Sequence, residues 1–146
     1  MTIDFALDTD YQLRHAAHQY RLELGWTTTV DGSQLAVELD DDIWGLRMPT
    51  GLAAELVAAL DRMDLSCPVI DLCDQQGVVL LLEPTGAAES VPPLPAQVGK
   101  LPAGRRVPLP PSMTARGPVR WLTPHEPVGG RRPSVRVVAD ALTHLT

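Results

Sequence analysis

Hydrophobic residues follow a helical period up to Gly25 and an alternating period after it. Between Asp8 and Leu24, apolar side chains recur every three or four residues, at Leu13, Ala16, Ala17, Tyr20 and Leu24. This spacing predicts an amphipathic helix. Thr9 or Asp10 is expected to cap the start of this helix, and Gly25 to end it.

The next part of the chain has the pattern of strands joined by turns. Residues 26–30 are rich in β-branched side chains, and residues 34–39 alternate between apolar and polar ones, which predicts two strands. The pair Asp31-Gly32 between them predicts a tight hairpin, because glycine accepts the positive φ of a primed turn. A polar turn at residues 40–42 precedes a third expected strand at residues 43–48.

A second helix is expected after Pro49, with Thr50 as its N-cap. Its apolar face consists of Leu52, Leu56, Ala59, Leu60 and Met63. Residues 68–72 and 77–82 follow as two short apolar strands. Their nearly continuous hydrophobicity predicts burial on both faces, and therefore a position at the centre of a sheet.

Prolines punctuate the remaining residues. Residues 83–104 contain five prolines and are predicted to form a long loop that does not pair in a sheet. Short strands are expected at residues 107–109 and 119–122, around a turn at Pro110-Pro111-Ser112, and a second proline-rich loop at residues 123–133. Ser134 is expected to cap a final helix, whose inner face carries Val138, Ala141, Leu142 and Leu145.

Together these elements predict a single α+β domain over residues 1–146. We expect a mixed or antiparallel sheet of five to seven short strands, about three helices and long proline-rich loops. A hydrophobic content of 45% is enough for a core. Because the chain has only one Phe, two Tyr and three Trp, Leu, Val and Ala must supply most of that core.

Charge is divided unevenly along the chain. Residues 1–90 carry 16 acidic and 4 basic side chains, whereas residues 91–146 carry 2 acidic and 8 basic ones, within a net charge of −6. This division predicts either that the two parts attract each other or that the basic part faces an anionic partner. A net charge of −6 disfavours a nucleic-acid backbone, so we place a protein partner first and nucleic acid second.

Cysteine usage and hydropathy point to an ordinary cytoplasmic protein. Cys67 and Cys73 have neither zinc-site nor redox-motif spacing, and we expect two reduced thiols in or beside a buried strand. The N-terminal residues lack a signal-peptide pattern, and the sequence has no apolar run long enough for a membrane span, so no membrane partner is expected. Formation of a homo-oligomer is left open.

Acidic residues offer two candidate metal sites. In the turn Asp40-Asp41-Asp42 the adjacent side chains splay apart, so at most two can converge on one ion, and a solvated turn is the simpler interpretation. Asp71 lies inside an apolar strand, where it needs either a basic partner or an outward orientation. We predict no metal and no cofactor. His15 and His18 are also expected to be ordinary helix residues.

Sequence motifs of catalysis and of nucleotide binding are missing. There is no G-x-S-x-G, no G-x-x-x-x-G-K-[ST] and no G-x-G-x-x-G, and His125 stands alone in its loop. The basic segment Gly129-Gly130-Arg131-Arg132 is a weak candidate for contact with phosphate. We therefore predict no catalytic residue.

One stretch of the chain resembles a known family. A strand ending in E-P-T-G at residues 83–86 is followed by a proline-rich loop and by G-R-R-V-P-L-P-P-S-M-T-A-R-G-P-V-R-W-L-T-P at residues 104–124. This order resembles the C-terminal part of bifunctional DNA primase/polymerase domains of the archaeo-eukaryotic primase type, and the opening helix with Gly25-Trp26 resembles their start. The chain resembles a diverged, stand-alone relative of the kind found in high-GC Gram-positive bacteria.

Departures from the family pattern weigh against its chemistry. Active members carry a D-x-D-type metal motif, an S-x-H motif and a further acidic residue, and this chain has no S-x-H. Asp40 and Asp42 have D-x-D spacing in a turn that comes too early. We therefore expect a non-catalytic binding or regulatory module, most of all a protein-binding one. The alternatives are a metal-dependent nucleotidyltransferase using Asp40, Asp42, Asp71 or Asp74, and a structural subunit of a larger assembly.

The expected binding face lies in the basic last third of the chain. The loop at residues 83–104 carries Val91, Leu94, Val98 and Leu101 among its prolines, which reduce the entropy lost on docking. We predict that it binds the partner together with its neighbouring side chains; the alternative is that it folds back over its own core. The candidate binding residues are Arg105, Arg106, Arg116, Arg120, Trp121, Arg131 and Arg132.

Overall fold

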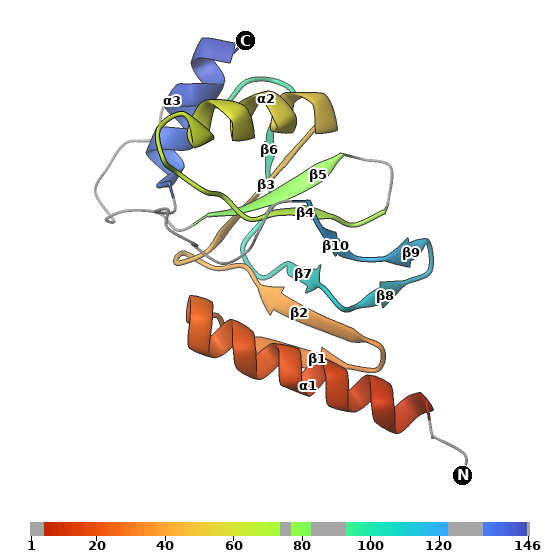
Figure 1. Ribbon diagram of the computed structural model, residues 1–146. Coiled ribbons are helices and arrows are strands. Elements are labelled where there is room, and N and C mark those ends of the chain that lie inside the picture. Colours follow the sequence, from red (N-terminus) through yellow and green to blue (C-terminus); the bar gives the residue numbers. More distant parts are fainter. Residues whose placement is uncertain (1–4, 74–76, 83–92, 123–132, 146) are drawn as a thin grey trace.

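The α+β class expected from the sequence is confirmed. In the computed structural model, residues 5–73, 77–82, 93–122 and 133–145 are described, and they form three helices and ten short strands (Figure 1). None of these helices has both the length and the hydrophobicity that a bilayer crossing requires.

The strands are distributed over three sheets rather than one, and every pairing is antiparallel. A five-stranded sheet has the order β10 (Arg120–Trp121), β4 (Val69–Asp71), β5 (Val78–Leu82), β3 (Trp44–Met48) and β6 (Gly99–Lys100). A three-stranded sheet has the order β1 (Thr28–Asp31), β2 (Gln34–Glu38) and β7 (Arg106–Leu109). The remaining pair is β8 (Met113–Thr114) with β9 (Gly117–Pro118).

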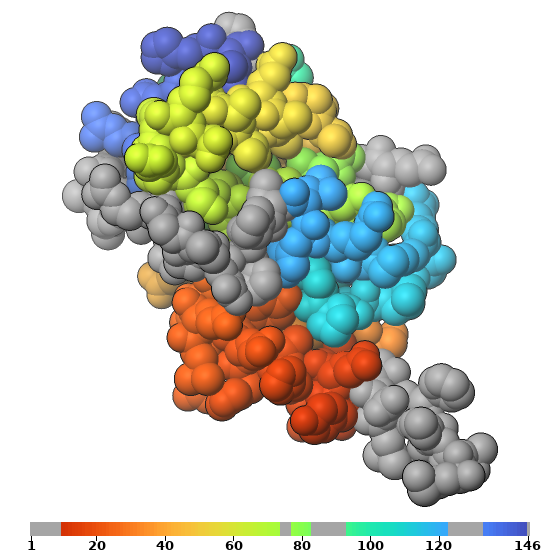
Figure 2. Space-filling view, in the orientation of Figure 1, coloured from red at the N-terminus to blue at the C-terminus, as the bar shows by residue number. Residues whose placement is uncertain are grey.

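Helices cover the two ends of this arrangement. Helix α1 (Phe5–Leu24) packs against β1 and β2, whereas α2 (Thr50–Asp61) and α3 (Val135–Leu145) pack together over the five-stranded sheet (Figure 1). Figure 2 shows the same order from outside, with α1 at the bottom, α2 and α3 at the top, and the segments from β7 to β10 between them.

The five-stranded sheet separates two hydrophobic cores, and β5 contributes to both. Val79 and Leu81 belong to the core shared with α1 and the three-stranded sheet. Val78, Leu80 and Leu82 belong to the core under α2 and α3. All five side chains are buried, so the sequence prediction of a central strand buried on both faces is confirmed.

The first helix and the hairpin follow the sequence prediction, except at the helix start. Helix α1 ends at Gly25, whose φ of +71° favours glycine, and Gly32 in the β1–β2 turn has φ +60°. The helix begins at Phe5, so Thr9 and Asp10 lie inside it and do not cap it. Asp10 instead accepts a hydrogen bond from Arg14 Nε at 2.8 Å, one helical turn later.

Of the N-caps predicted for the other two helices, the one for α2 is wrong and the one for α3 is confirmed. Pro49 is the N-cap residue of α2, without a side-chain hydrogen bond, and Thr50 is already helical, so the prediction of Thr50 as the cap is wrong. Proline has no backbone N–H group, and at the start of a helix this group would have no partner within the helix in any case. At α3 the prediction is confirmed, because Ser134 Oγ accepts a hydrogen bond from Val137 N at 3.2 Å.

The described part of the proline-rich segment, residues 93–104, folds back over the protein. Its two residues in β6 pair with β3, so the prediction that this segment does not pair in a sheet is wrong. The stretch from Ala96 to Leu101 contains no proline, which leaves room for a short edge strand. Val98 and Leu101 are buried in the two cores, as in the alternative in which this segment covers its own core.

The turn after β7 holds the buried hydroxyl of Ser112. Ser112 N donates to Leu109 O at 2.9 Å, and the turn contains a cis peptide bond between Pro110 and Pro111. Ser112 Oγ accepts from Leu35 N at 2.7 Å and donates to Leu35 O at 2.9 Å. The hydroxyl therefore bonds both backbone groups of Leu35 in β2, next to Pro110 and Pro111, which have no N–H group to donate.

Candidate functional site

A basic pocket of about 460 Å³ lies at the β3–β6 edge of the five-stranded sheet. Its lining includes the three cationic residues Arg47, Lys100 and Arg105, together with Gln97 and Gly99. Among the described residues that line it, none is acidic. In a chain of net charge −6, this is a local concentration of positive charge.

Strand β6 forms one wall of the basic pocket. In the antiparallel register, Gly99 lies opposite Arg47 and Lys100 opposite Leu46, and Leu101 N donates to Gly45 O at 2.9 Å. A Cβ on Gly45 would lie only 3.1 Å from the Leu101 side chain, so glycine at this position allows the close approach of the segment after β6.

The segment after β6 carries Arg105 to the same pocket. Leu39 N donates to Arg105 O at 2.8 Å, and Gly104 N donates to Leu39 O at 2.7 Å. These two bonds join residues 104–105 to the end of β2. The position of Arg105 beside the pocket is therefore set by backbone bonds and does not depend on its own exposed side chain.

Lys100 is held by an aromatic ring. Its Nζ lies 3.8 Å from the centroid of the Trp44 ring, which is the geometry of a cation–π contact. Arg47 is half-buried, whereas Lys100 and Arg105 are exposed. A guanidinium group presents paired N–H donors, so the two arginines suit a carboxylate or a phosphate.

A second pocket, of about 510 Å³, is acidic. It is lined by Glu38, Asp40 and Asp42 together with apolar residues that include Trp26 and Ile43. Asp40 Oδ1 accepts hydrogen bonds from Asp42 N at 2.7 Å and from Ile43 N at 3.1 Å, so this carboxylate stabilises its own turn. Within the described part of the chain, no three His, Cys, Asp or Glu side chains form a group that could hold a metal ion.

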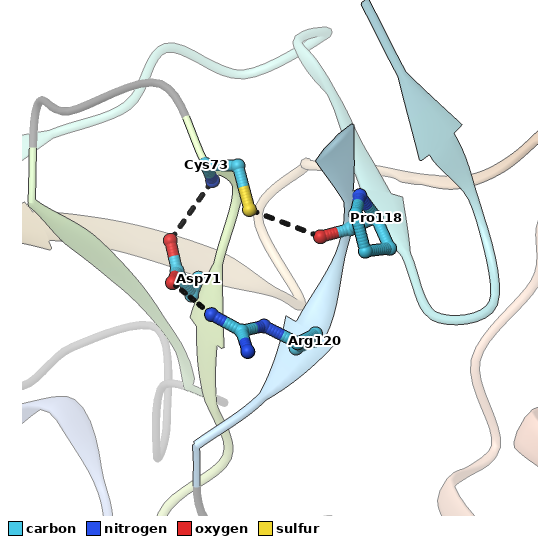
Figure 3. Close-up of polar contacts among 4 residues, drawn as sticks. All are labelled: Asp71, Cys73, Pro118 and Arg120. Atoms are coloured by element: carbon cyan, nitrogen blue, oxygen red, sulfur yellow. Dashed lines mark hydrogen bonds and ion pairs between the residues drawn. The ribbon is translucent and has the colours of Figure 1, made fainter. Parts of the chain in front are cut away.

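Asp71 forms an ion pair with Arg120, a residue in the basic last third of the chain (Figure 3). Arg120 Nη2 lies 3.4 Å from Asp71 Oδ2, and Asp71 Oδ1 accepts a hydrogen bond from Cys73 N at 2.8 Å. The Cys73 thiol donates to Pro118 O at 3.0 Å. Asp71 thus lies where β4 pairs with β10, and both of its carboxylate oxygens have a partner there. Asp74 lies outside the described residues.

Both cysteines are free thiols, in agreement with the sequence prediction. Cys67 is buried, and burial raises the pKa of its thiol well above the ordinary value. Cys73 is half-buried.

Trp121 belongs to an aromatic cluster with Tyr20 and Trp26. Its ring centroid lies 6.1 Å from that of Tyr20 and 6.4 Å from that of Trp26. Trp121 Nε1 donates to Tyr20 Oη at 3.0 Å, and Tyr20 Oη donates to Pro110 O at 2.6 Å. Burial of the phenol raises the pKa of Tyr20 to about 12. Trp121 is half-buried in this cluster and joins β10 to α1.

The four candidate arginines that the structure describes do not gather on one surface. Arg105 lines the basic pocket, Arg106 lies opposite Glu38 in the β7–β2 register, and Arg120 pairs with Asp71. Arg116 is exposed between β8 and β9. Strands β6 and β10 are opposite edges of the five-stranded sheet, so Arg105 and Arg120 belong to different sides of it.

Three further residues considered in the sequence analysis lie outside the described residues, namely Arg131, Arg132 and His125. Sequence reasoning missed Arg47 and Lys100. Arg47 had one available signal, since it is the only charged residue in the apolar strand β3. Lys100 had none, because its importance depends on the pairing of β6.

Comparison with known proteins gives no relative: no protein-family model, no curated protein and no solved structure matches this chain.

Proposed function

We propose that this protein is a non-catalytic binding module, on a scaffold resembling a primase/polymerase domain, which docks an anionic part of a protein partner at the basic pocket. The observation that carries the proposal is the grouping of Arg47, Lys100 and Arg105 around one pocket, in whose described lining there is no acidic residue. Charges collected in a concave site act together on one ligand group, whereas isolated surface charges contribute little.

A protein partner fits the distribution of charge better than nucleic acid does. A nucleic-acid backbone needs a continuous basic stripe, whereas the described arginines of the last third lie on different sheets and edges. One of them, Arg120, is already paired with Asp71. The net charge of −6 adds a long-range repulsion against polyanions.

The arrangement of carboxylates supports binding over nucleotidyl transfer. Asp40 and Asp42 share a pocket, but Asp40 accepts two backbone hydrogen bonds of its own turn. Asp71, the other described candidate, lies on β4 and pairs with Arg120. Two-metal transfer requires carboxylates that converge on both ions, and these three side chains are divided between two places.

Docking is expected to be electrostatic rather than apolar. Of the four apolar side chains proposed for a docking face, Val98 and Leu101 are buried in the protein's own cores, and Leu94 is half-buried against one of them. Val91 lies outside the described residues. The accessible features near them are the cationic residues of the basic pocket. We therefore expect an affinity that falls as salt rises, because the Debye length is only about 8 Å at physiological ionic strength.

The test is capture of a partner from a native lysate, followed by titration of the purified partner. The wild-type protein is compared with Lys100→Glu/Arg105→Glu and with Arg62→Glu, a control at the exposed end of α2. The proposal requires that the partner binds wild type and Arg62→Glu alike and binds the pocket variant at least about 10-fold more weakly, which is about 1.4 kcal/mol. Equal binding to all three proteins, or capture that disappears on nuclease treatment, would refute it.

A further inference from the structure

The basic and the acidic pocket are neighbours. Arg105, which lines the basic pocket, is hydrogen-bonded through its backbone to Leu39. Leu39 lies between Glu38 and Asp40 in the sequence, and both of these line the acidic pocket. Adjacent residues are about 3.8 Å apart along the chain, and paired strands about 4.8 Å apart, so the backbones of the two linings lie within about one Debye length.

The edge strand beside the basic pocket is poorly suited to strand addition. Strand β6 is only two residues long, with Pro95 and Pro102 close to its two ends. Proline lacks an N–H group and is one of the devices that protect sheet edges from pairing with another chain. The ligand must therefore be recognised through a compact group that enters the pocket, and not through an added strand.

Apolar residues complete the lining of the basic pocket. Met48, Pro49, Ala96 and Leu101 lie alongside the cationic residues. A ligand group with a short aliphatic stem and a charged end would contact both kinds of lining. An aspartate or glutamate side chain has this form, whereas inorganic phosphate has no stem.

We propose that the basic pocket takes a single side-chain carboxylate of an acidic peptide segment, and that Glu38, Asp40 and Asp42 beside it exclude polyanions. This inference rests on the proposed function and names its ligand. A lone carboxylate can pair with the exposed side chain of Arg105 without approaching the acidic pocket. A polyphosphate chain that reached Arg105 would bring further negative charges close to the three carboxylates, where like charges repel.

The direct experiment uses three probes and amide chemical shifts of the full chain. The probes are a short Ala/Ser peptide with one central Glu, the same peptide with Gln, and inorganic phosphate. We expect the Glu peptide to shift the amides of Gly99, Lys100 and Arg105, and the Gln peptide to bind at least about 10-fold more weakly. Arg105→Gln should weaken the Glu peptide about 10-fold, and Lys100→Gln about 3-fold, with Arg62→Gln unchanged.

Polyanion exclusion is tested with a single-stranded oligothymidylate. Replacing three carboxylates together, in Glu38→Gln/Asp40→Asn/Asp42→Asn, should raise its affinity at least about 5-fold, while binding of the Glu peptide changes less than about 2-fold. Asn at position 40 keeps the oxygen that accepts the bonds of its turn.

Three results would overturn the inference: equal binding of the Glu and Gln peptides, phosphate bound more tightly than the Glu peptide, or an oligonucleotide affinity unaffected by the triple substitution.

Other results distinguish a failure of the proposed function from a failure of this inference. If the Glu peptide binds the pocket but the affinity of the captured partner is unchanged by Lys100→Glu/Arg105→Glu, the carboxylate site is supported and the proposed function is wrong, because the partner binds another surface. If partner binding is weakened by Lys100→Glu/Arg105→Glu but by no substitution of the partner's own Asp or Glu residues, the proposed function is supported and the assignment of a carboxylate ligand is wrong.

Discussion

Removal of the Tyr20 hydroxyl should destabilise the fold in a way that depends on pH. The hydroxyl donates to Pro110 O at 2.6 Å and accepts from Trp121 Nε1 at 3.0 Å. Tyr20→Phe keeps the ring among its aromatic neighbours and removes both bonds. A hydrogen bond contributes about 1 kcal/mol net, and an unsatisfied buried group costs more, so we expect a loss of about 1–3 kcal/mol near neutral pH.

The pH dependence follows from the raised pKa of the phenol. Desolvation is the main cause of the rise to about 12; the hydrogen bond from Trp121 lowers the pKa, and the charge of Glu23 raises it. The folded pKa lies above the unfolded value of about 10, so the protonated phenol stabilises the fold fully below pH 10. That stability is lost as the pH rises through 12, and it amounts to about 2.7 kcal/mol when the loss is complete.

Urea unfolding at pH 8 and pH 11 measures this effect. Between these two values, wild type should lose about 1.4 kcal/mol more than Tyr20→Phe does, because at pH 11 the unfolded phenol is mostly ionised and the folded one is not. Cys67, whose thiol pKa is also raised, is present in both proteins, so its contribution cancels. Tyr11→Phe is the control, since Tyr11 is 69% exposed. A wild-type-minus-mutant difference that stays constant with pH, or a similar change in Tyr11→Phe, would refute the reasoning.

Three further substitutions test the fold. Ser112→Ala leaves two buried backbone groups of β2 without their partner and should lower the free energy of unfolding by about 2–3 kcal/mol, whereas Ser33→Ala, at an exposed turn, should change it by less than about 0.5 kcal/mol. Gly77→Ala places a Cβ against a carbonyl oxygen of β3 at φ +95° and should cost more than about 2 kcal/mol in chemical denaturation, while Gly51→Ala, in open space on α2, should stabilise slightly. Asp71→Asn removes an ion pair but keeps an acceptor oxygen, so its melting temperature should fall by no more than about 4 °C; a much larger fall would mean that the pair matters more than its exposure indicates.

Periodicity predicted most of the fold because it reports burial. The helical spacing ending at Gly25, the glycine turn at Gly32 and the apolar run of β5 each follow from a local rule, and each is confirmed. Ser134 was found for the same reason, because a helix cap depends on residues only three positions away.

Features that depend on distant segments could not be predicted. Strand β6 is defined by pairing with β3, more than 50 residues earlier in the chain, and no local pattern marks it. The same holds for the basic pocket, which Arg47 and Lys100 line together only because β6 pairs with β3. Charge along the sequence suggested that Arg105, Arg106, Arg116 and Arg120 act together, but the topology distributes them over different sheets and edges.

The contact between Tyr20 and Trp121 has a consequence for how the chain folds during synthesis. The two residues are 101 positions apart, and the partners in the β2–β7 pairing, from Leu35↔Leu109 to Glu38↔Arg106, are 68 to 74 positions apart. At about 5–20 residues per second, the ribosome needs about 5–20 s to make the chain between Tyr20 and its partner. For that time the side chain of Tyr20 and one edge of β2 lack the segments that cover them. The nascent N-terminal part is therefore expected to bind chaperones until the last third emerges, and translation stalled before residue 106 should leave an aggregation-prone product.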